Sequence, residues 1–202
     1  RILERYGMSE TIINTSNPLQ GERVAGTVGF ALPGQQVRVA SEDGVVVPAG
    51  EVGMIEVAGP NVFQGYWRMP EKTAEEVRPD GFFITGDLGV QAADGRLSIV
   101  GRSKDLVISG GYNVYPKEVE VALDEMLQVA ESAVIGVPHP DFGEAVVAVV
   151  VPVGAKVTQA DVDAALGGQL ARFKQPKRVL NVAELPRNTM GKVQKNLLRD
   201  QY

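Results

Sequence analysis

Lys192 follows Met190 and Gly191 in LPRNTMGKVQKN (185–196), a segment rich in glycine and asparagine. Such a segment has few side chains that pack, so we expect a loop that exposes the lysine amine. An exposed ammonium is a compact positive charge on a long stem, and the chemistry open to it is the neutralisation of an anion. Taken alone, a lysine in this setting is most often an ordinary solvated residue.

The segment around Lys192 is positively charged although the protein is acidic. The chain has 20 Lys and Arg against 25 Asp and Glu, a net charge of −5, which argues against a general nucleic-acid or anionic-membrane binder. Between 171 and 202, however, eight basic residues accompany only two acidic ones. This segment is either a solvated surface or a lid or arm that approaches an anion.

The composition excludes several kinds of chemistry. The chain contains no cysteine, which excludes a disulfide scaffold, a cysteine nucleophile and a thiolate metal site, and predicts a reducing, cytoplasmic location. Its one histidine, His139, has no obvious acidic or nucleophilic partner in the sequence. The longest apolar run, 145–155, is far shorter than the roughly 20 residues of a membrane-spanning helix. We therefore expect no membrane association.

The first half of the chain reads as short strands separated by turns. The turns EDG, PAGE, PDG and ADG separate apolar runs at 35–40, 53–59, 82–86 and 97–101. This spacing is typical of a small antiparallel β-barrel or sandwich, and we expect Trp67 to pack under its edge. The chain starts at Arg1 in what reads as the end of a strand, so we expect a fragment of a longer protein.

From about residue 103 strands alternate with amphipathic helices. Pro116 suits the first turn of a helix, and two apolar strands follow at 132–137 and 145–152. Thr158 and Asp161 have the spacing of a capping box, which predicts a second helix running to about Phe173. A strand at 178–185 and a terminal helix complete the pattern. The sequence predicts an α+β fold with two parts, 1–102 and 103–202.

Five segments carry a resemblance that covers nearly the whole chain. In order they are YGMSET (6–11), GMIEVAGPNVFQGYW (53–67), FFITGDLG (82–89), GRSKDLVISGGYNVYPKEVE (101–120) and FKQPKRVLNVAELPRNTMGK (173–192). They resemble the carboxyl-terminal half of the adenylate-forming superfamily, which includes acyl-CoA synthetases, luciferase-type enzymes and peptide-synthetase adenylation domains. Within this superfamily, the sequences of these segments are most similar to those of malonyl-CoA synthetases. The resemblance implies the end of an N-terminal adenylation domain (1–102) followed by a C-terminal lid domain (103–202).

The resemblance implies an ATP-dependent acid–CoA ligase. In such enzymes a carboxylate attacks the α-phosphorus of ATP, pyrophosphate leaves, and the thiol of coenzyme A takes the acyl group from the acyl-adenylate. Charge accumulates on phosphate oxygens in the first step, so catalysis is mainly positioning and electrostatic stabilisation. The implied small molecules are ATP, Mg²⁺, coenzyme A and a carboxylic or dicarboxylic acid. The phosphate loop and most of the acyl pocket of this family lie upstream, so the fragment alone is expected to be inactive.

In YGMSET the resemblance implies that Glu10 holds Mg²⁺ and that Ser9 donates its hydroxyl to the α-phosphate. Most relatives have threonine at the position of Ser9, which keeps the hydroxyl. Tyr6 and Gly7 are implied to contact the nucleotide, and Met8 to line the acyl pocket. Without the resemblance, Glu10 reads as a capping carboxylate in a turn, and Met8 as a core side chain.

In TGDLG the resemblance implies that Asp87 accepts hydrogen bonds from the two ribose hydroxyls, and Arg102 makes a second ribose contact. An ionised carboxylate with two oxygens suits the first role. The alternatives are an Asx-turn at Gly86-Asp87 and a structural ion pair for Arg102.

The remaining roles concern a moving C-terminal domain. By resemblance Lys104 is the hinge, and rotation about it presents Lys192 to the carboxylate and α-phosphate in the first half-reaction. The same rotation then presents Gly110 and Gly111 to the coenzyme A channel, although these glycines also suit a plain turn between a strand and a helix. Since acylation of Lys192 would remove its charge, a lysine acyltransferase is an expected partner.

Three alternatives stay open. Another adenylate-forming enzyme, such as a peptide-synthetase domain or a luciferase-like oxygenase, would share Asp87, Arg102 and Lys192. The chain could also be a non-catalytic module that binds a nucleotide or coenzyme A, or a purely structural fragment. No arginine in 1–100 is assignable to a second carboxylate of the substrate, so the sequence does not select malonate, and it does not predict the oligomeric state.

Overall fold

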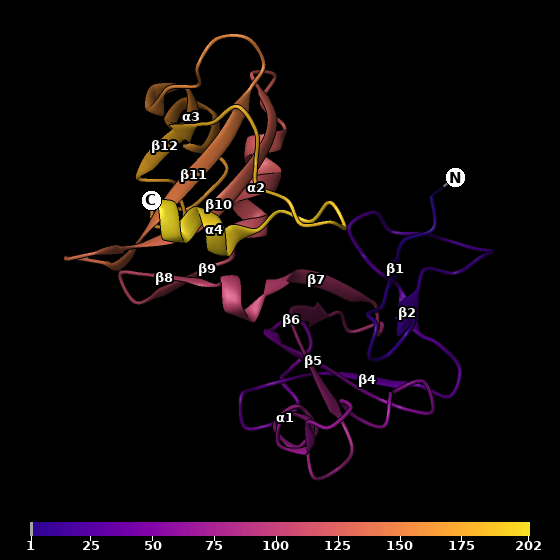
Figure 1. Cartoon of the computed structure of the whole chain (residues 1–202). Helices are drawn as coiled ribbons and strands as arrows, with labels where there is room; N and C mark the ends of the chain where they lie inside the picture. Colours follow the sequence, from indigo (N-terminus) through magenta and orange to yellow (C-terminus); the bar gives the residue numbers. More distant parts are fainter. Residues whose placement is uncertain (1) are drawn as a thin grey trace. The chain divides into compact units, whose positions relative to one another are not determined.

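The chain folds into two units, Arg1–Ser103 and Lys104–Tyr202, called unit 1 and unit 2 below. The computed structural model describes residues 2–202 (Figure 1). Each unit contains its own sheet and its own cluster of buried apolar side chains. Within residues 2–202 no helix combines the length and apolar character needed to cross a bilayer.

Unit 1 is built around a four-stranded antiparallel sheet. Its strands, in the spatial order β4-β5-β6-β7, are β4 (Gln36–Ala40), β5 (Val52–Ala58), β6 (Phe83–Gln91) and β7 (Leu97–Arg102). Side chains of a strand alternate between its two faces, and in β6 the buried positions include Phe83, Thr85 and Asp87. The carboxylate of Asp87 is therefore carried on the buried face of this sheet.

Three two-residue strands and one helix complete unit 1. A small antiparallel sheet consists of β1 (Arg5–Tyr6), β2 (Thr15–Ser16) and β3 (Phe30–Ala31). Tyr6 packs with Val39, Ile55, Val57 and Leu97 in the apolar cluster of the unit. The helix α1 (Pro70–Glu76) begins with proline in its first turn, where the missing N–H costs no hydrogen bond.

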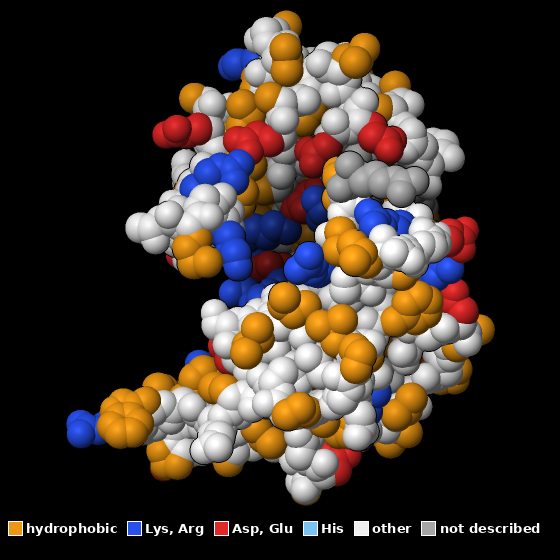
Figure 2. Space-filling view, turned by 90° about the vertical axis from the view of Figure 1, so that its right-hand side faces the viewer, with side chains coloured by type: hydrophobic (Ala, Val, Ile, Leu, Met, Phe, Trp, Pro, Cys, Tyr) orange, Lys and Arg blue, Asp and Glu red, His pale blue; other side chains and the backbone are white. Residues whose placement is uncertain are grey.

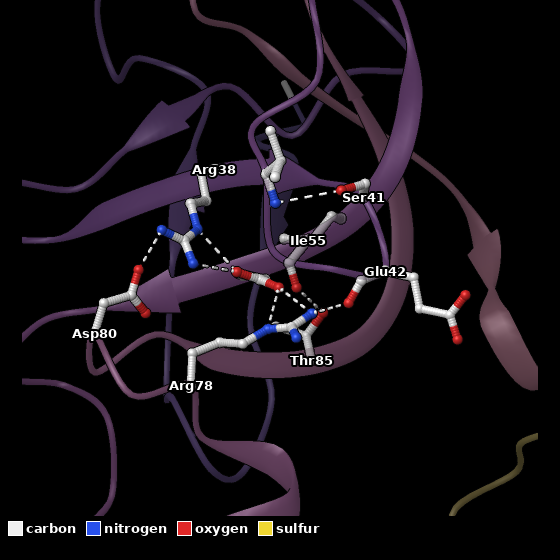
Figure 3. A network of polar contacts seen from close by, with 9 residues as sticks. Arg38, Ser41, Glu42, Ile55, Arg78, Asp80 and Thr85 are labelled. Carbon is white, nitrogen blue, oxygen red and sulfur yellow. Dashed lines mark hydrogen bonds and ion pairs between the residues drawn. The ribbon is translucent and has the colours of Figure 1, made fainter.

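A buried carboxylate joins three elements of unit 1 (Figure 3). Glu56 of β5 is fully buried, and its oxygens accept hydrogen bonds from Arg38 Nε at 2.8 Å and Arg78 Nε at 2.9 Å. Arg38 also reaches Asp80 at 2.6 Å, and Arg78 donates to the backbone oxygen of Glu42 at 2.8 Å. A buried charge needs such partners, and here they tie β4 and the segment before β6 to the centre of the sheet.

Unit 2 has a five-stranded sheet with helices on both faces. Its long hairpin, β10 (Val129–His139) and β11 (Gly143–Pro152), is extended by β8 (Val107–Ser109), β9 (Tyr112–Val114) and the parallel strand β12 (Arg178–Asn181). The helices are α2 (Pro116–Asp124), α3 (Gln159–Leu166) and α4 (Lys195–Gln201), with a 3₁₀ turn η1 at Ser103–Asp105.

Both faces of this sheet are buried. Val146, Ala148 and Val150 of β11 pack in one apolar cluster with residues of α2 and α3. Val147 and Val149 pack on the opposite face with Leu198 of α4. This arrangement explains why β11 is an almost continuous apolar run rather than an alternating one.

The predicted α+β fold class is confirmed. Pro116 begins α2, and the Thr158 hydroxyl accepts a hydrogen bond from the Asp161 amide in a complete capping box. The helix after Thr158 was predicted too long, because it ends at Leu166 and two glycines follow immediately. In the described part of unit 1, the strands form open sheets and no closed barrel.

The predicted burial of Trp67 is wrong, since this side chain is 84% exposed. Arg68 has φ of 57° and the amide of Met69 bonds to the carbonyl of Tyr66 at 3.1 Å. This turn keeps Tyr66 against Phe63, with ring centroids 4.8 Å apart, while Trp67 reaches solvent. Hydrophobic side chains also reach the surface at several other points, as the face in Figure 2 shows, which is normal for folded proteins.

Candidate functional site

The structure brings three of the predicted nucleotide-binding residues together in unit 1. Asp87 of β6 and Arg102 of β7 are direct cross-strand partners, and Arg102 Nε lies 2.7 Å from Asp87 Oδ1. The phenol of Tyr6 in β1 donates to Asp87 Oδ2 at 2.6 Å. Tyr6 and Asp87 are each 6% exposed, whereas the side chain of Arg102 is 45% exposed. The buried carboxylate is therefore held from both sides, and the arginine on one side reaches solvent.

This geometry answers one of the two alternatives for the TGDLG motif. Asp87 lies within β6 and pairs with β7, so the Asx-turn reading is wrong. The ion pair between Arg102 and Asp87 is present, which leaves both the structural and the ribose-binding reading of Arg102 possible. Gly86, with φ of 74°, takes the left-handed conformation just before Asp87, which glycine adopts without strain.

The contact between Tyr6 and Asp87 has an electrostatic consequence for the phenol. Burial raises the pKa of Tyr6 above its ordinary value, and the neighbouring negative charge of Asp87 raises it further. The phenol therefore stays protonated and acts as a donor. Each oxygen of a carboxylate can accept about two hydrogen bonds, so Asp87 keeps one accepting position on each oxygen for two further donors.

The YGMSET segment after Tyr6 is a tight and strained turn. A Cβ on Gly7 would lie 2.0 Å from the carbonyl oxygen of Ile12, so only glycine fits there. Ile12 itself has φ of 59°, a conformation that is a genuine outlier for a β-branched residue. Such strain concentrates at functional sites. Within this turn Ser9 is exposed and Met8 is half-buried.

Glu10, the predicted magnesium ligand, lies beside a tyrosine that the sequence analysis did not single out. The single phenolic proton of Tyr66 is donated to Glu76 Oε2 at 2.6 Å, and the same phenol oxygen lies 3.2 Å from Glu10 Oε1. Burial and the bond to Glu76 raise the pKa of Tyr66 above its ordinary value, so it too remains a donor. The side chain of Glu10 is half-buried and the residue lies in a turn, so the alternative of a capping carboxylate in a turn stays open.

The carboxylate of Glu10 fits a magnesium ion that is shared with phosphates. Among residues 2–202 no three His, Cys, Asp or Glu side chains cluster as a metal site. Mg²⁺ is commonly held by one or two carboxylates together with waters and phosphate oxygens. A single carboxylate at a strained turn is consistent with that mode of binding.

Lys104 lies at the division between the two units. Ser103 donates to the carbonyl of Gly86 within unit 1 at 3.1 Å, and Asp105 pairs with Arg199 within unit 2 at 3.1 Å. Lys104 is exposed between these two tied residues. A short exposed segment with fixed neighbours is what a hinge requires.

Gly110 and Gly111 form the two-residue turn of the hairpin β8–β9. Ser109 pairs with Tyr112, and the glycines between them have φ of 60° and 82°. Both glycines are exposed, and two positive φ values favour glycine in such a turn. The expected turn between a strand and a helix was wrong, because the turn joins two strands. The tip offers an exposed backbone without Cβ atoms.

Lys192 is exposed at the end of a tight loop in unit 2. The loop is closed by a bridge between Arg187 and Val193, and Gly191 has φ of 77°. The amide of Gly191 bonds to the carbonyl of Asn188 at 2.9 Å. The amine is exposed as expected, and the backbone of the loop carries hydrogen bonds that its glycine and asparagine content did not reveal.

The predicted site residues thus fall into two groups. Tyr6, Gly7, Met8, Ser9, Glu10, Asp87 and Arg102 belong to unit 1, and Lys104, Gly110, Gly111 and Lys192 belong to unit 2. Direct contacts join Tyr6, Asp87 and Arg102. Sequence reasoning missed Tyr66 and Asn188. Tyr66 lies in the quoted GYW motif, and Asn188 lies four residues before Lys192, so their positions were visible but their contacts were not.

Two family models together match most of the chain. The AMP-binding enzyme family matches residues 1–67, and the AMP-binding enzyme C-terminal domain matches residues 118–192, together more than half of the chain. The chain belongs to the AMP-binding, adenylate-forming enzyme family.

Individual relatives are acid–CoA ligases and related enzymes. ATP-bound MatB from Rhodopseudomonas palustris is 63% identical with a TM-score of 0.95, over 100% of this chain and 40% of that chain. Malonate–CoA ligase from Arabidopsis thaliana is 40% identical over 98% of this chain and 34% of its own length. The amide bond synthetase McbA from Marinactinospora thermotolerans is 35% identical with a TM-score of 0.90, over 99% of this chain and 42% of that chain. The chain thus spans well under half the length of these relatives.

Proposed function

We propose that this chain is the carboxyl-terminal part of an AMP-forming acid–CoA ligase similar to malonyl-CoA synthetase. The observation that carries the proposal is the Asp87 carboxylate, which Tyr6 and Arg102 hold while one accepting position on each oxygen stays available. Two adjacent acceptors suit the two hydroxyls of a ribose. The 40% identity to malonate–CoA ligase from Arabidopsis thaliana supports malonate or a related acid as the substrate.

We assign the two parts of the chain different tasks. Residues 1–102 are proposed to be the end of the adenylation domain and 103–202 the lid domain, with Lys104 as the hinge between them. The exposed position of Lys104 between two tied residues supports this assignment. The activity is proposed for the longer protein, since the chain covers only 40% of MatB, and a cytoplasmic location stays a prediction.

In the first half-reaction the residues of unit 1 hold the nucleotide. Asp87 and Arg102 bind the ribose, Ser9 donates its hydroxyl to the α-phosphate, and the strained turn at Gly7 brings the backbone close. Glu10 is proposed to hold Mg²⁺, which when bound neutralises phosphate charge. Met8 is proposed to border the acyl group. The ammonium of Lys192 offsets the negative charge that grows as the carboxylate attacks the α-phosphorus.

In the second half-reaction the lid domain is proposed to present the turn of Gly110 and Gly111 to the pantetheine arm of coenzyme A. The exposed glycine backbone, without Cβ atoms, permits a close approach. The thiol then attacks the acyl carbonyl and AMP leaves. The amine of Lys192 is exposed, so a lysine acyltransferase can reach it. Acylation would remove its charge and thereby stop the first half-reaction.

The proposal is tested by supplying the missing upstream part. Residues 1–202 are fused behind the preceding portion of R. palustris MatB, and ATP–pyrophosphate exchange is measured with malonate, methylmalonate and acetate. Because most of the acyl pocket lies upstream, the fusion tests whether this chain completes the reaction, and the preference among the acids belongs to the MatB portion. Thioester formation with coenzyme A is the second readout, and amide formation with a supplied amine separates an amide synthetase. The proposal is supported if one of the acids promotes ATP–pyrophosphate exchange and coenzyme A then yields the thioester. A folded chimera that exchanges with none of these acids contradicts it.

Asp87→Asn in the same chimera tests the ribose site. Loss of the negative charge is expected to raise the KM for ATP by about tenfold, since hydrogen bonds to a charged acceptor are worth about 1.5–3 kcal/mol. Asp43→Asn is the matched control, because Asp43 is an exposed carboxylate in a turn of the same unit. Equal KM values of the two variants for ATP would show that Asp87 does not bind the ribose.

A further inference from the structure

The loop that carries Lys192 is organised by one side chain, Asn188. Its Oδ1 accepts hydrogen bonds from the backbone amides of Met190 and Lys192, each at 3.0 Å. Its own backbone amide donates to the carbonyl of Lys192 at 3.0 Å. A single carboxamide thus fixes the backbone on both sides of Gly191 and at Lys192 itself.

A second side chain ties the loop to the sheet of unit 2. Arg187 donates from Nη1 to the carbonyl of Gly191 at 2.7 Å, and its Nη2 pairs with Glu131 of β10. The amide of Gln194 bonds to the carbonyl of Pro186 at 2.8 Å and closes the base of the loop. The Arg187–Glu131 pair is solvent-exposed and contributes little stability by itself. Its effect is to restrict where the loop lies on unit 2.

We propose that Asn188 is a positioning residue for the first half-reaction, acting through the backbone of Lys192. This inference rests on the proposed function. Movement then arises at the hinge while the loop stays rigid, so that Lys192 arrives already oriented. Ordering a flexible loop at each turnover would cost about 1–2 kcal/mol per residue in conformational entropy, and a loop ordered in advance avoids this cost.

A purely structural role is the competing explanation, and the structure argues against it. The segment after the loop is anchored independently, since Lys195 of α4 pairs with Glu120 of α2 at 2.5 Å and Leu198 packs in the apolar cluster. Asn188 is exposed, as are Met190 and Gly191. Loss of the Asn188 bonds should therefore loosen the loop without unfolding unit 2.

Two matched variants test the proposal, Asn188→Thr and Asn188→Val. Threonine and valine have nearly the same shape, but only threonine offers an oxygen that can accept from a backbone amide two residues on. In the 202-residue chain, hydrogen exchange of the Met190 and Lys192 amides is measured first. We expect Asn188→Val to exchange about tenfold faster than Asn188→Thr at the Met190 amide, as loss of about one hydrogen bond predicts. The Lys192 amide, four residues on, should exchange faster in both variants than in the unsubstituted chain.

The same variants are then compared in the MatB chimera. Asn188→Val is expected to lower kcat for ATP–pyrophosphate exchange about tenfold, with the KM for ATP and thioester formation from a supplied acyl-adenylate unchanged. Asn188→Thr, which can restore the bond to the Met190 amide only, should recover part of the loss. If both variants match the unsubstituted chimera in exchange rate, or if both half-reactions fall equally, the positioning role is refuted while the proposed function stands. A folded unsubstituted chimera without any exchange activity would refute the proposed function and the positioning role with it.

Discussion

Replacing Tyr6 by phenylalanine removes one oxygen from the interior of unit 1 and leaves the ring in place. The lost contact is the 2.6 Å hydrogen bond to Asp87, whose side chain is only 9% exposed. A hydrogen bond to a charged group is worth about 1.5–3 kcal/mol, and burial leaves little water to replace the phenol. We expect the free energy of unfolding of unit 1 to fall by that amount.

Hydrogen exchange of the most protected β6 amides measures this change, because such amides exchange through unfolding of the whole unit. Tyr66→Phe is the matched control, since Tyr66 also donates to a carboxylate, that of Glu76, but is only partly buried. Its effect should stay below about 1 kcal/mol. Similar losses for the two variants, or no loss for Tyr6→Phe, would refute the idea that the Tyr6 phenol fixes the Asp87 carboxylate.

The same contact predicts an alkaline dependence of stability. The folded state raises the pKa of Tyr6 above its ordinary value of 10.0, mainly through burial. A raised pKa favours the protonated form in the folded state, so the contribution is fully present below pH 10 and is lost progressively as the pH rises above it. The stability of unit 1 should therefore decline less steeply above pH 10 in Tyr6→Phe than in the unsubstituted chain.

Three further predictions concern other elements. Glu56→Gln should destabilise unit 1 by roughly 3 kcal/mol in urea unfolding, because two arginines lose a buried counter-charge, and an unchanged midpoint would contradict the network in Figure 3. Thr158→Ala should lower the Tm of unit 2 and reduce its loss of stability on acidification below about pH 4. The reason is that the bonds from Thr158 lower the pKa of Asp161, whose contribution disappears as pH falls through the lowered value; an acid limb identical to the parent's would exclude this cap. Gly111→Val should slow thioester formation in the chimera while leaving pyrophosphate exchange unchanged, since φ of 82° disfavours a β-branched residue, and equal rates of thioester formation would remove this turn from the coenzyme A channel.

The sequence predicted those parts of the fold that depend on local patterns. Pro116 and the Thr158–Asp161 pair mark helix starts, because capping chemistry operates over three or four residues. The end of α3 was misjudged, because the apolar spacing continues past the two glycines that follow Leu166. Trp67 was misplaced because residue type alone does not determine which way a turn directs a side chain.

The candidate site was predictable as a set of residues but not as a set of contacts. Tyr6 and Asp87 are separated by 81 positions, and their hydrogen bond depends on how β1 packs against the sheet that contains β6. The order of the Lys192 loop likewise depends on the Asn188 side chain accepting from two amides, one of which lies beyond a glycine with positive φ. Glycine and asparagine content indicates a turn but does not say how rigid it is.

The account depends most on the claim that Lys192 serves one half-reaction only. The direct test is Lys192→Ala in the MatB chimera, with Lys156→Ala as control because Lys156 is another exposed lysine of unit 2. Pyrophosphate exchange and thioester formation from a supplied acyl-adenylate are measured separately for both variants. The account predicts that Lys192→Ala lowers exchange by about a hundredfold or more, as loss of a charge that stabilises a transition state does, and leaves thioester formation at the control rate. Equal loss of both half-reactions, or no loss of exchange, would contradict it.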